Sequence, residues 1–174
     1  MTKLDYLPIF DGHNDVLQSI YLPKDGKPRP FFELNEKGHL DLPRMRQGGF
    51  AGGFFAIFVP SGTKDDDFPG GNSKTGRAQY DLPLPPALDL KLAQAVTLKG
   101  MATLFQLERQ SEGQLKVVRS VEDLKSCIEQ GVIAAVLHFE GAEAIDTDLD
   151  ALHVDGRAYA QALETARRAH LGFM

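Results

Sequence analysis

The segment Asp11-Gly12-His13-Asn14-Asp15 combines residue types that bind divalent metal ions. It follows the short apolar run 6–10, which predicts a β-strand. Side chains two positions apart point to the same side of a strand, so we expect His13 and Asp15 to lie next to each other. An imidazole nitrogen beside a carboxylate oxygen is a good pair of metal ligands. A His-x-Asp pair is also common by chance, so the spacing alone leaves an ordinary polar turn as the alternative.

A second candidate ligand, Glu140, stands at the end of another apolar run, residues 132–139. This run and the nearly continuous apolar run 50–59 lack polar alternation, which is typical of strands covered on both faces in a parallel sheet. The carboxyl ends of parallel strands meet at one edge, where α/β barrels build their active sites. We therefore expect Glu140 to lie near His13 and Asp15.

Helical patterns separate these strands. They predict short helices over residues 16–21 and 41–47, a long helix over 87–110 and another over 120–130, with a short strand at 115–118 between the last two. Asp41 and Ser120 have the type and position of N-caps. Strands that alternate with helices predict an α/β fold with a parallel sheet and right-handed crossovers.

Length and composition predict a single domain spanning residues 1–174. The net charge of −5 disfavours nucleic acid as a partner. The longest uncharged run, 47–63, is broken by glycines and a proline, so no membrane-spanning segment is expected. No signal peptide is expected, because the first thirty residues contain no long apolar run, and the one cysteine, Cys127, falls in an amphipathic pattern that predicts a buried thiol. These features favour a cytoplasmic protein.

Several other residues have simpler explanations. Residues 60–86 form a long polar segment that suggests a lid or binding loop, and its acidic run 65–67 is expected to be solvated. His138 is equally compatible with a supporting role for the metal site and with an ordinary core histidine. The remaining assignments are His39 as a loop residue, Asn14 as a turn residue, Glu143 as local support for the turn after Glu140, and Gly52-Gly53 as a point of close backbone packing.

Three motifs taken together resemble the membrane (renal) dipeptidase family. They are Asp11-Gly12-His13-Asn14-Asp15, then Gly49-Phe50-Ala51-Gly52-Gly53-Phe54-Phe55, then His138-Phe139-Glu140-Gly141-Ala142-Glu143. The resemblance extends from about Leu7 to Leu152. It implies a zinc peptidase fold related to the amidohydrolases, with this chain as the N-terminal half of a (β/α)8 TIM-type barrel that stops before closure.

The resemblance also implies a site and a reaction. The family binds two zinc ions. On the matching positions His13 and Asp15 would hold the first ion, and Glu140 would bridge both ions and take part in catalysis. The two histidines of the second ion come from later strands of the family's barrel and have no match in this chain. The implied reaction is hydrolysis of the peptide bond of small dipeptides by a zinc-activated hydroxide.

Three alternatives remain open. An incomplete barrel predicts weak or no activity, so the chain could be a non-catalytic fragment that binds metal or forms a homo-oligomer through its open sheet edge. It could instead be an amidohydrolase acting on another small amide or lactone. The ligand types also suit manganese or cobalt.

Residues 155–174 depart from the family pattern and have a helix-like composition, which a frameshift or a divergent tail would explain.

Overall fold

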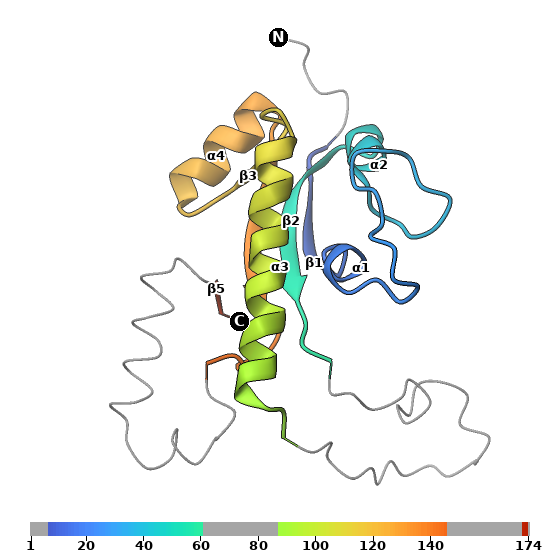
Figure 1. The fold of residues 1–174 in the computed structure, drawn as a ribbon. Helices are drawn as coiled ribbons and strands as arrows, with labels where there is room; N and C mark the ends of the chain where they lie inside the picture. Colours follow the sequence, from blue (N-terminus) through green and yellow to red (C-terminus); the bar gives the residue numbers. More distant parts are fainter. Residues whose placement is uncertain (1–6, 61–86, 146–171, 174) are drawn as a thin grey trace, which may run out of the picture.

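The computed structural model of the chain describes residues 7–60, 87–145 and 172–173 (Figure 1). The elements are β1 (Ile9–Asn14), α1 (Gln18–Tyr21), α2 (Leu42–Gln47), β2 (Phe50–Ile57), α3 (Leu90–Gln110), β3 (Leu115–Val117), α4 (Val121–Gln130), β4 (Ile133–Phe139) and β5 (Gly172–Phe173). The predicted loop 60–86, apart from its first residue, and most of the tail 155–174 lie outside the described residues. Within that tail, only the short strand β5 is described.

The described strands form one sheet in the order β1-β2-β4-β3, with β5 paired to the carboxyl end of β4. Every pair is parallel. The β2–β4 register is regular from Gly52 opposite Ala134 to Ile57 opposite Phe139, whereas the β1–β2 register shifts twice. The prediction of a parallel α/β sheet is confirmed, and the sheet is not closed.

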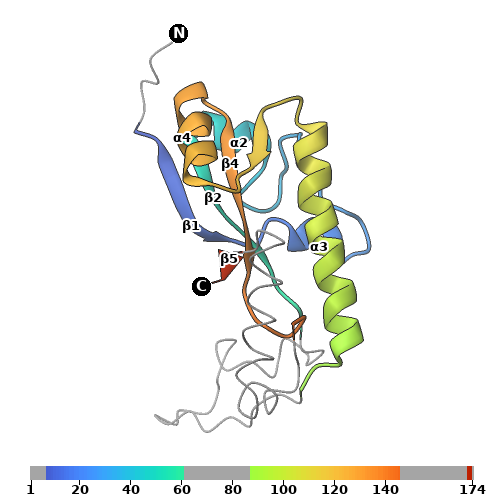
Figure 2. The ribbon, with the colours of Figure 1, turned by 90° about the vertical axis from the view of Figure 1, so that its left-hand side faces the viewer.

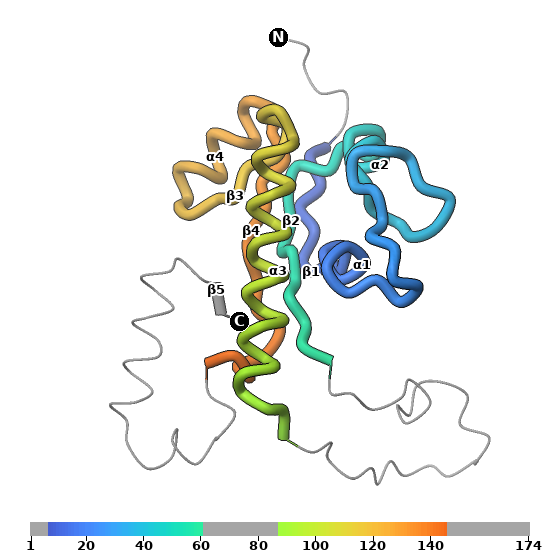
Figure 3. Tube along the Cα trace, in the orientation of Figure 1, coloured from blue at the N-terminus to red at the C-terminus, as the bar shows by residue number. Residues whose placement is uncertain are grey.

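The two short helices follow β1. The helix α1 is shorter than predicted and lies beside α3, as the chain trace shows (Figure 3). The helix α2 begins as predicted: Asp41 is its N-cap, and its side chain accepts a hydrogen bond from the Arg44 backbone N–H at 2.9 Å. A proline in the first turn and Gly48 at the C-cap fix its ends.

The long helix α3 packs one face of the sheet. Asp89 caps it by accepting a hydrogen bond from the Leu92 N–H. Gly100 lies in the middle of the helix without breaking it, because it permits close approach to β2. A Cβ atom at this position would come within about 3.0 Å of the Ile57 side chain.

The helix α4 lies on the opposite side of the sheet from α3 (Figure 2). As predicted, Ser120 caps its start, and Gly131 ends it in the left-handed conformation, at φ 68°. Cys127 on this helix is buried as predicted, and burial raises the pKa of its thiol.

The core is divided between these two faces. The larger cluster joins α1, α2 and α3 to alternate positions of β2 and β4, and its fully buried members include Leu17, Met45, Phe55, Leu104 and Ile133. The smaller cluster lies under α4 and contains Val118, Cys127 and Ala134. Among the described elements, α4 packs against β4 and β2 on this second face and lies near the start of β4 (Figure 2).

Close packing at the centre of the sheet depends on Gly52, as expected for the glycine pair. A Cβ atom there would lie 2.5 Å from the backbone oxygen of Ala134 and 2.9 Å from the Phe10 ring.

In the described part of the chain, no helix has the length and apolar character needed to cross a membrane.

Candidate metal centre

The candidate ligands lie at the carboxyl edge of the sheet. The strand β1 extends to Asn14, so His13 is part of the strand, and the prediction of a strand ending at residue 10 is too short. The register shift between Asp11 and Asn14 makes this end irregular. Asp15 follows immediately, and its backbone oxygen accepts a hydrogen bond from the Gln18 N–H at the start of α1.

The structure brings His13, Asp15 and Glu140 together. His13 Nε2 lies 3.4 Å from Asp15 Oδ1 and 3.7 Å from Glu140 Oε2, and the ligand atoms of all three residues lie within 4.8 Å of one another. Ligands bound to one ion at about 2.0–2.2 Å are at most roughly 4.4 Å apart. Small side-chain movements would therefore allow these three residues to hold one cation.

The three side chains are open to solvent. The exposed fractions are 37% for His13, 58% for Asp15 and 38% for Glu140. Glu140 is fixed through its backbone, since its N–H donates to the Ile57 carbonyl at 3.2 Å. An ion at this position would keep access to water and to a small ligand, as a catalytic rather than a closed structural metal site requires.

His138 lies directly behind the candidate ligands. It is buried, and its ring meets the His13 ring edge-on at a centroid distance of 5.5 Å and the Phe54 ring at 5.9 Å. Burial lowers the pKa of His138, the nearby His13 lowers it further, and Glu140 opposes the shift. The His138 ring therefore packs against the back of the site, where its protonated form is disfavoured.

Tyr21 is a residue of this region that the sequence did not indicate. Its buried hydroxyl donates to the Phe58 carbonyl at 2.9 Å and accepts from the Phe58 N–H at 3.1 Å. Burial raises the pKa of Tyr21 above its usual value. These two bonds attach α1 to the chain just beyond β2. In the sequence Tyr21 has only the appearance of an apolar helix residue.

The second His-x-Asp pair stays away from the site. His39 is an exposed loop residue and Asp41 is the cap of α2, both as predicted. Asp41 is fully buried and also pairs with the Arg44 guanidinium. The Glu143 carboxylate lies against the turn at Gly141, so close that a Cβ atom at Gly141 would overlap it. This position agrees with the expected role of Glu143 as local support for the turn.

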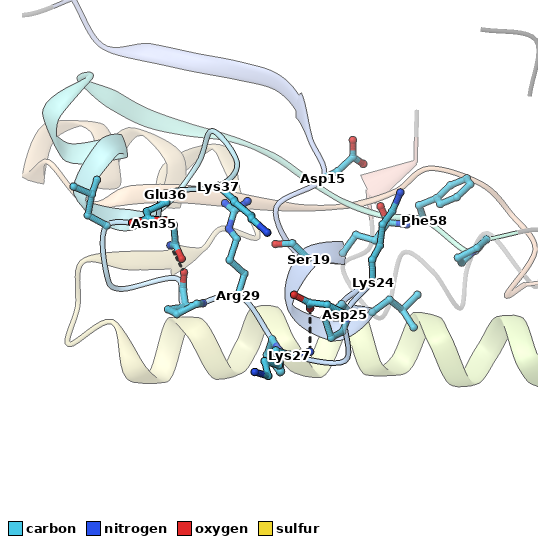
Figure 4. A pocket seen from close by; sticks show the side chains of 17 residues that line it. Asp15, Ser19, Lys24, Asp25, Lys27, Arg29, Asn35, Glu36, Lys37 and Phe58 are labelled. Atoms are coloured by element: carbon cyan, nitrogen blue, oxygen red, sulfur yellow. Dashed lines mark hydrogen bonds between the residues drawn. The ribbon is translucent and has the colours of Figure 1, made fainter. Parts of the chain in front are cut away.

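A cleft of about 1130 Å³ opens beside Asp15 (Figure 4). Its walls come from α1, Phe58 and the irregular segment 22–37. Charged groups of both signs line it: Lys24, Asp25, Lys27, Arg29, Glu36 and Lys37. The cleft thus places a ligand-sized space, lined by both apolar and charged side chains, next to one of the candidate metal ligands.

A family model described as membrane dipeptidase (Peptidase family M19) matches residues 3–160. The chain belongs to this family. An uncharacterized protein from the PQQ-III 3′ region of Acinetobacter calcoaceticus is 33% identical over 153 residues, which cover 87% of this chain and 46% of that protein.

Two solved structures of M19 relatives have a similar fold. A metallopeptidase from Rhodobacter sphaeroides, liganded with a phosphinate mimic of the dipeptide L-Ala-D-Ala, is 42% identical with a TM-score of 0.69, and the match covers 86% of this chain and 42% of that one. Dipeptidase AC, also a metallopeptidase, is 40% identical with a TM-score of 0.64, covering 87% and 42%. The M19 chain therefore spans less than half the length of these relatives, and its open parallel sheet corresponds to part of their TIM barrel.

Proposed function

We propose that this chain carries part of the active site of a zinc-dependent dipeptidase, in which His13, Asp15 and Glu140 hold a metal ion. The observation that supports the proposal most strongly is the convergence of the three ligand atoms within 4.8 Å at the carboxyl edge of a parallel sheet. Membership of the M19 family and the dipeptide mimic held by the Rhodobacter sphaeroides relative support dipeptides as the substrate class.

A zinc ion bound here would supply Lewis-acid chemistry, which lowers the pKa of water and polarises a peptide carbonyl. The residues of the chain have separate parts in this proposal. His13 at the end of β1 and Asp15 directly after it would bind the ion from one side, while Glu140, directly after β4, presents Oε2 to His13. The second oxygen of Glu140 is suited to accept a proton from the attacking water or to bind a second ion.

Zinc is the proposed ion because one imidazole and two carboxylates suit it, although manganese and cobalt bind the same ligand types. The family resemblance implies two ions. In this chain we assign ligands to the first ion and the bridging position only. The cleft beside Asp15 is the proposed place for the dipeptide to approach.

Metal content and hydrolysis test the proposal together. The purified chain should bind about one zinc ion per molecule by elemental analysis, and His13→Ala should abolish this binding. His39→Ala is the matched control, because it removes a histidine of the same His-x-Asp spacing from an exposed loop. Unchanged zinc binding by His13→Ala would contradict the assignment.

Activity is expected to be weak. A site with one assigned ion would stabilise transition-state charge less well than a two-ion site. Release of amino acids from a panel of dipeptides, L-Ala-D-Ala among them, should be slow and should disappear in His13→Ala. Rapid hydrolysis by the chain would show that the site is more complete than we propose.

A second candidate function is a non-catalytic, self-associating metal-binding fragment. The observation that favours it is the outer strand β1, where Ile9 is 53% and Phe10 39% exposed. Such an edge can pair with a strand of another chain. This alternative predicts stoichiometric metal without turnover, and oligomers that grow with concentration in sedimentation experiments. The cytoplasmic location stays a prediction from the sequence.

A further inference from the structure

The backbone between Asp11 and Asn14 poses a structural problem for the candidate site. The register between β1 and β2 shifts at this point, so the regular ladder of backbone hydrogen bonds is interrupted. His13 lies inside the irregular part and Asp15 directly after it. Something other than the regular ladder must therefore hold the two ligands in place.

Asn14, between the two ligands, makes the missing connections. It is only 7% exposed. Its Nδ2 atom donates to Asp11 Oδ2 at 2.9 Å within β1, and to the Phe54 carbonyl at 3.1 Å in β2. The expectation that Asn14 is a simple turn residue is therefore wrong, because the turn begins after it and its side chain points into the structure.

The orientation of the Asn14 amide follows from its partners. Both partners are acceptors, a carboxylate and a carbonyl, so the nitrogen must face them. The Oδ1 atom of Asn14 is buried and has no hydrogen-bond partner among the described residues. Only the donor end of the amide is used there, which indicates that this position needs N–H groups rather than a polar side chain in general.

Asp11 extends the connection to His13. Its Oδ1 atom lies 3.4 Å from the backbone nitrogen of His13, which donates to it, while its Oδ2 atom accepts from Asn14. The carboxylate of Asp11 therefore contacts the irregular segment at two points. Replacing Asp11 with alanine would remove both of these hydrogen bonds, the one from the His13 N–H and the one from the Asn14 amide.

We propose that Asn14 is a positioning residue of the metal centre, whose side-chain amide fixes the irregular end of β1 to Asp11 and Phe54 so that His13 and Asp15 face Glu140. The inference rests on the proposed function for the metal, but the effect on β1 itself is independent of it. In this proposal Asn14 binds neither the ion nor the substrate and acts through the two ligands that flank it.

The test compares Asn14→Ala and Asn14→Asp with the parent chain. Asn14→Asp keeps the size and polarity of the side chain but removes both N–H donors. Residues that orient metal ligands typically change metal affinity by about 10–100-fold when substituted. We expect zinc affinity, measured by isothermal titration calorimetry, to fall by a factor in that range in both variants. The visible spectrum of bound Co²⁺ should change with the ligand geometry.

Ser111→Ala is the matched control. Ser111 is also buried, and its hydroxyl also connects backbone groups: it accepts from the Leu115 N–H at 3.0 Å and donates to the Glu108 carbonyl at 2.8 Å. It lies before the start of β3, at the opposite edge of the sheet from His13. Its loss should lower the melting temperature and leave zinc affinity and the Co²⁺ spectrum unchanged.

Hydrogen exchange of the metal-free chain separates this inference from the proposed function. Asn14→Asp should accelerate amide exchange in residues 9–15 and leave residues 115–117 unchanged. If the parent chain binds no zinc, the proposed function fails, and faster exchange in 9–15 still supports the role of Asn14. If Asn14→Ala does not fold, Asp11→Ala removes one of the two connections and should give a smaller effect of the same kind. Parent-like exchange and zinc affinity in Asn14→Asp would overturn the inference.

Discussion

His13 Nε2 lies 3.7 Å from Glu140 Oε2, although His13 is in β1 and Glu140 directly follows β4, two strands that are not neighbours in the sheet. The strand β2 runs between β1 and β4 and pairs with both. Neighbouring strands are about 4.8 Å apart, so the two ligand-bearing backbones are separated by roughly twice that distance. The side chains of His13 and Glu140 reach across the end of β2 to meet. The position of β2 therefore sets how closely they can approach.

The carboxylate of Glu140 is expected to be essential for tight metal binding. Glu140→Gln keeps the size of the side chain but removes the negative charge that a divalent cation needs. We expect zinc affinity to fall by at least about 10-fold, which corresponds to about 1.4 kcal/mol. Titration calorimetry measures this directly. Glu143→Gln, which changes a carboxylate of the adjacent turn, should bind zinc like the parent chain.

Gly52 should be intolerant of any side chain. In Gly52→Ala the new Cβ atom would lie 2.5 Å from the Ala134 carbonyl oxygen, so β2 and β4 would have to separate. We expect a loss of about 1–3 kcal/mol in the free energy of unfolding, together with weaker zinc binding because Glu140 follows β4. Gly12→Ala is the control, since nothing lies within 4 Å of a Cβ atom at Gly12. Equal stability of the two variants would contradict the packing argument.

Asp41 should make stability depend on acid pH. Burial raises its pKa, but hydrogen bonds from the Arg44 and Asn35 N–H groups and the charge of Arg44 outweigh this effect, so the pKa lies below the ordinary 3.8. The stabilisation by Asp41 is therefore complete above the unfolded-state value and is lost as pH falls through the lower folded-state value.

Asp41→Asn tests this pH dependence. It keeps a capping side chain but removes the charge, so we expect a loss of about 1.5–3 kcal/mol at neutral pH, as for hydrogen bonds to charged groups. Urea unfolding at several pH values should show the difference from the parent shrinking below the unfolded-state pKa. Asp25→Asn, an exposed loop carboxylate, is the control. A difference that stays constant down to the lowest pH would refute the prediction.

The face of α3 that meets the sheet should carry most of its contribution to stability. Leu104 is fully buried, whereas Leu98 on the same helix is 62% exposed. Leu104→Ala should lower the free energy of unfolding by about 2–5 kcal/mol, and Leu98→Ala should change it by less than about 0.5 kcal/mol. Urea unfolding curves of the two variants measure the contrast. Similar losses would place the helix in a different orientation.

Much of the fold could be predicted because the signals are local. Asp41 and Ser120 act as caps, Gly131 ends α4, and the apolar runs 50–59 and 132–139 contain the central strands. These features depend on backbone propensity and on burial, which residue types reveal directly.

Other features depend on tertiary contacts and were missed. Apolar runs give no information on which strands become neighbours, so the position of β3 beside β4 and of α4 on the opposite face from α3 could not be derived. The extension of β1 to Asn14 was missed because the polar residues Asp11 and His13 interrupt the strand pattern. The hydrogen bonds from the Asn14 and Tyr21 side chains to the backbone at Phe54 and Phe58 hold this region together, and residue types alone do not reveal such long-range bonds.

The segment that carries Asp15 is attached to β2 and its extension at both ends. Before it, the Asn14 amide reaches the Phe54 carbonyl, and after it, the Tyr21 hydroxyl is bonded to Phe58. Conformational freedom of this short stretch is therefore lost when the chain folds rather than when an ion arrives. The consequence is that the backbone carrying His13 and Asp15 is already ordered, so binding of an ion would cost little additional conformational entropy.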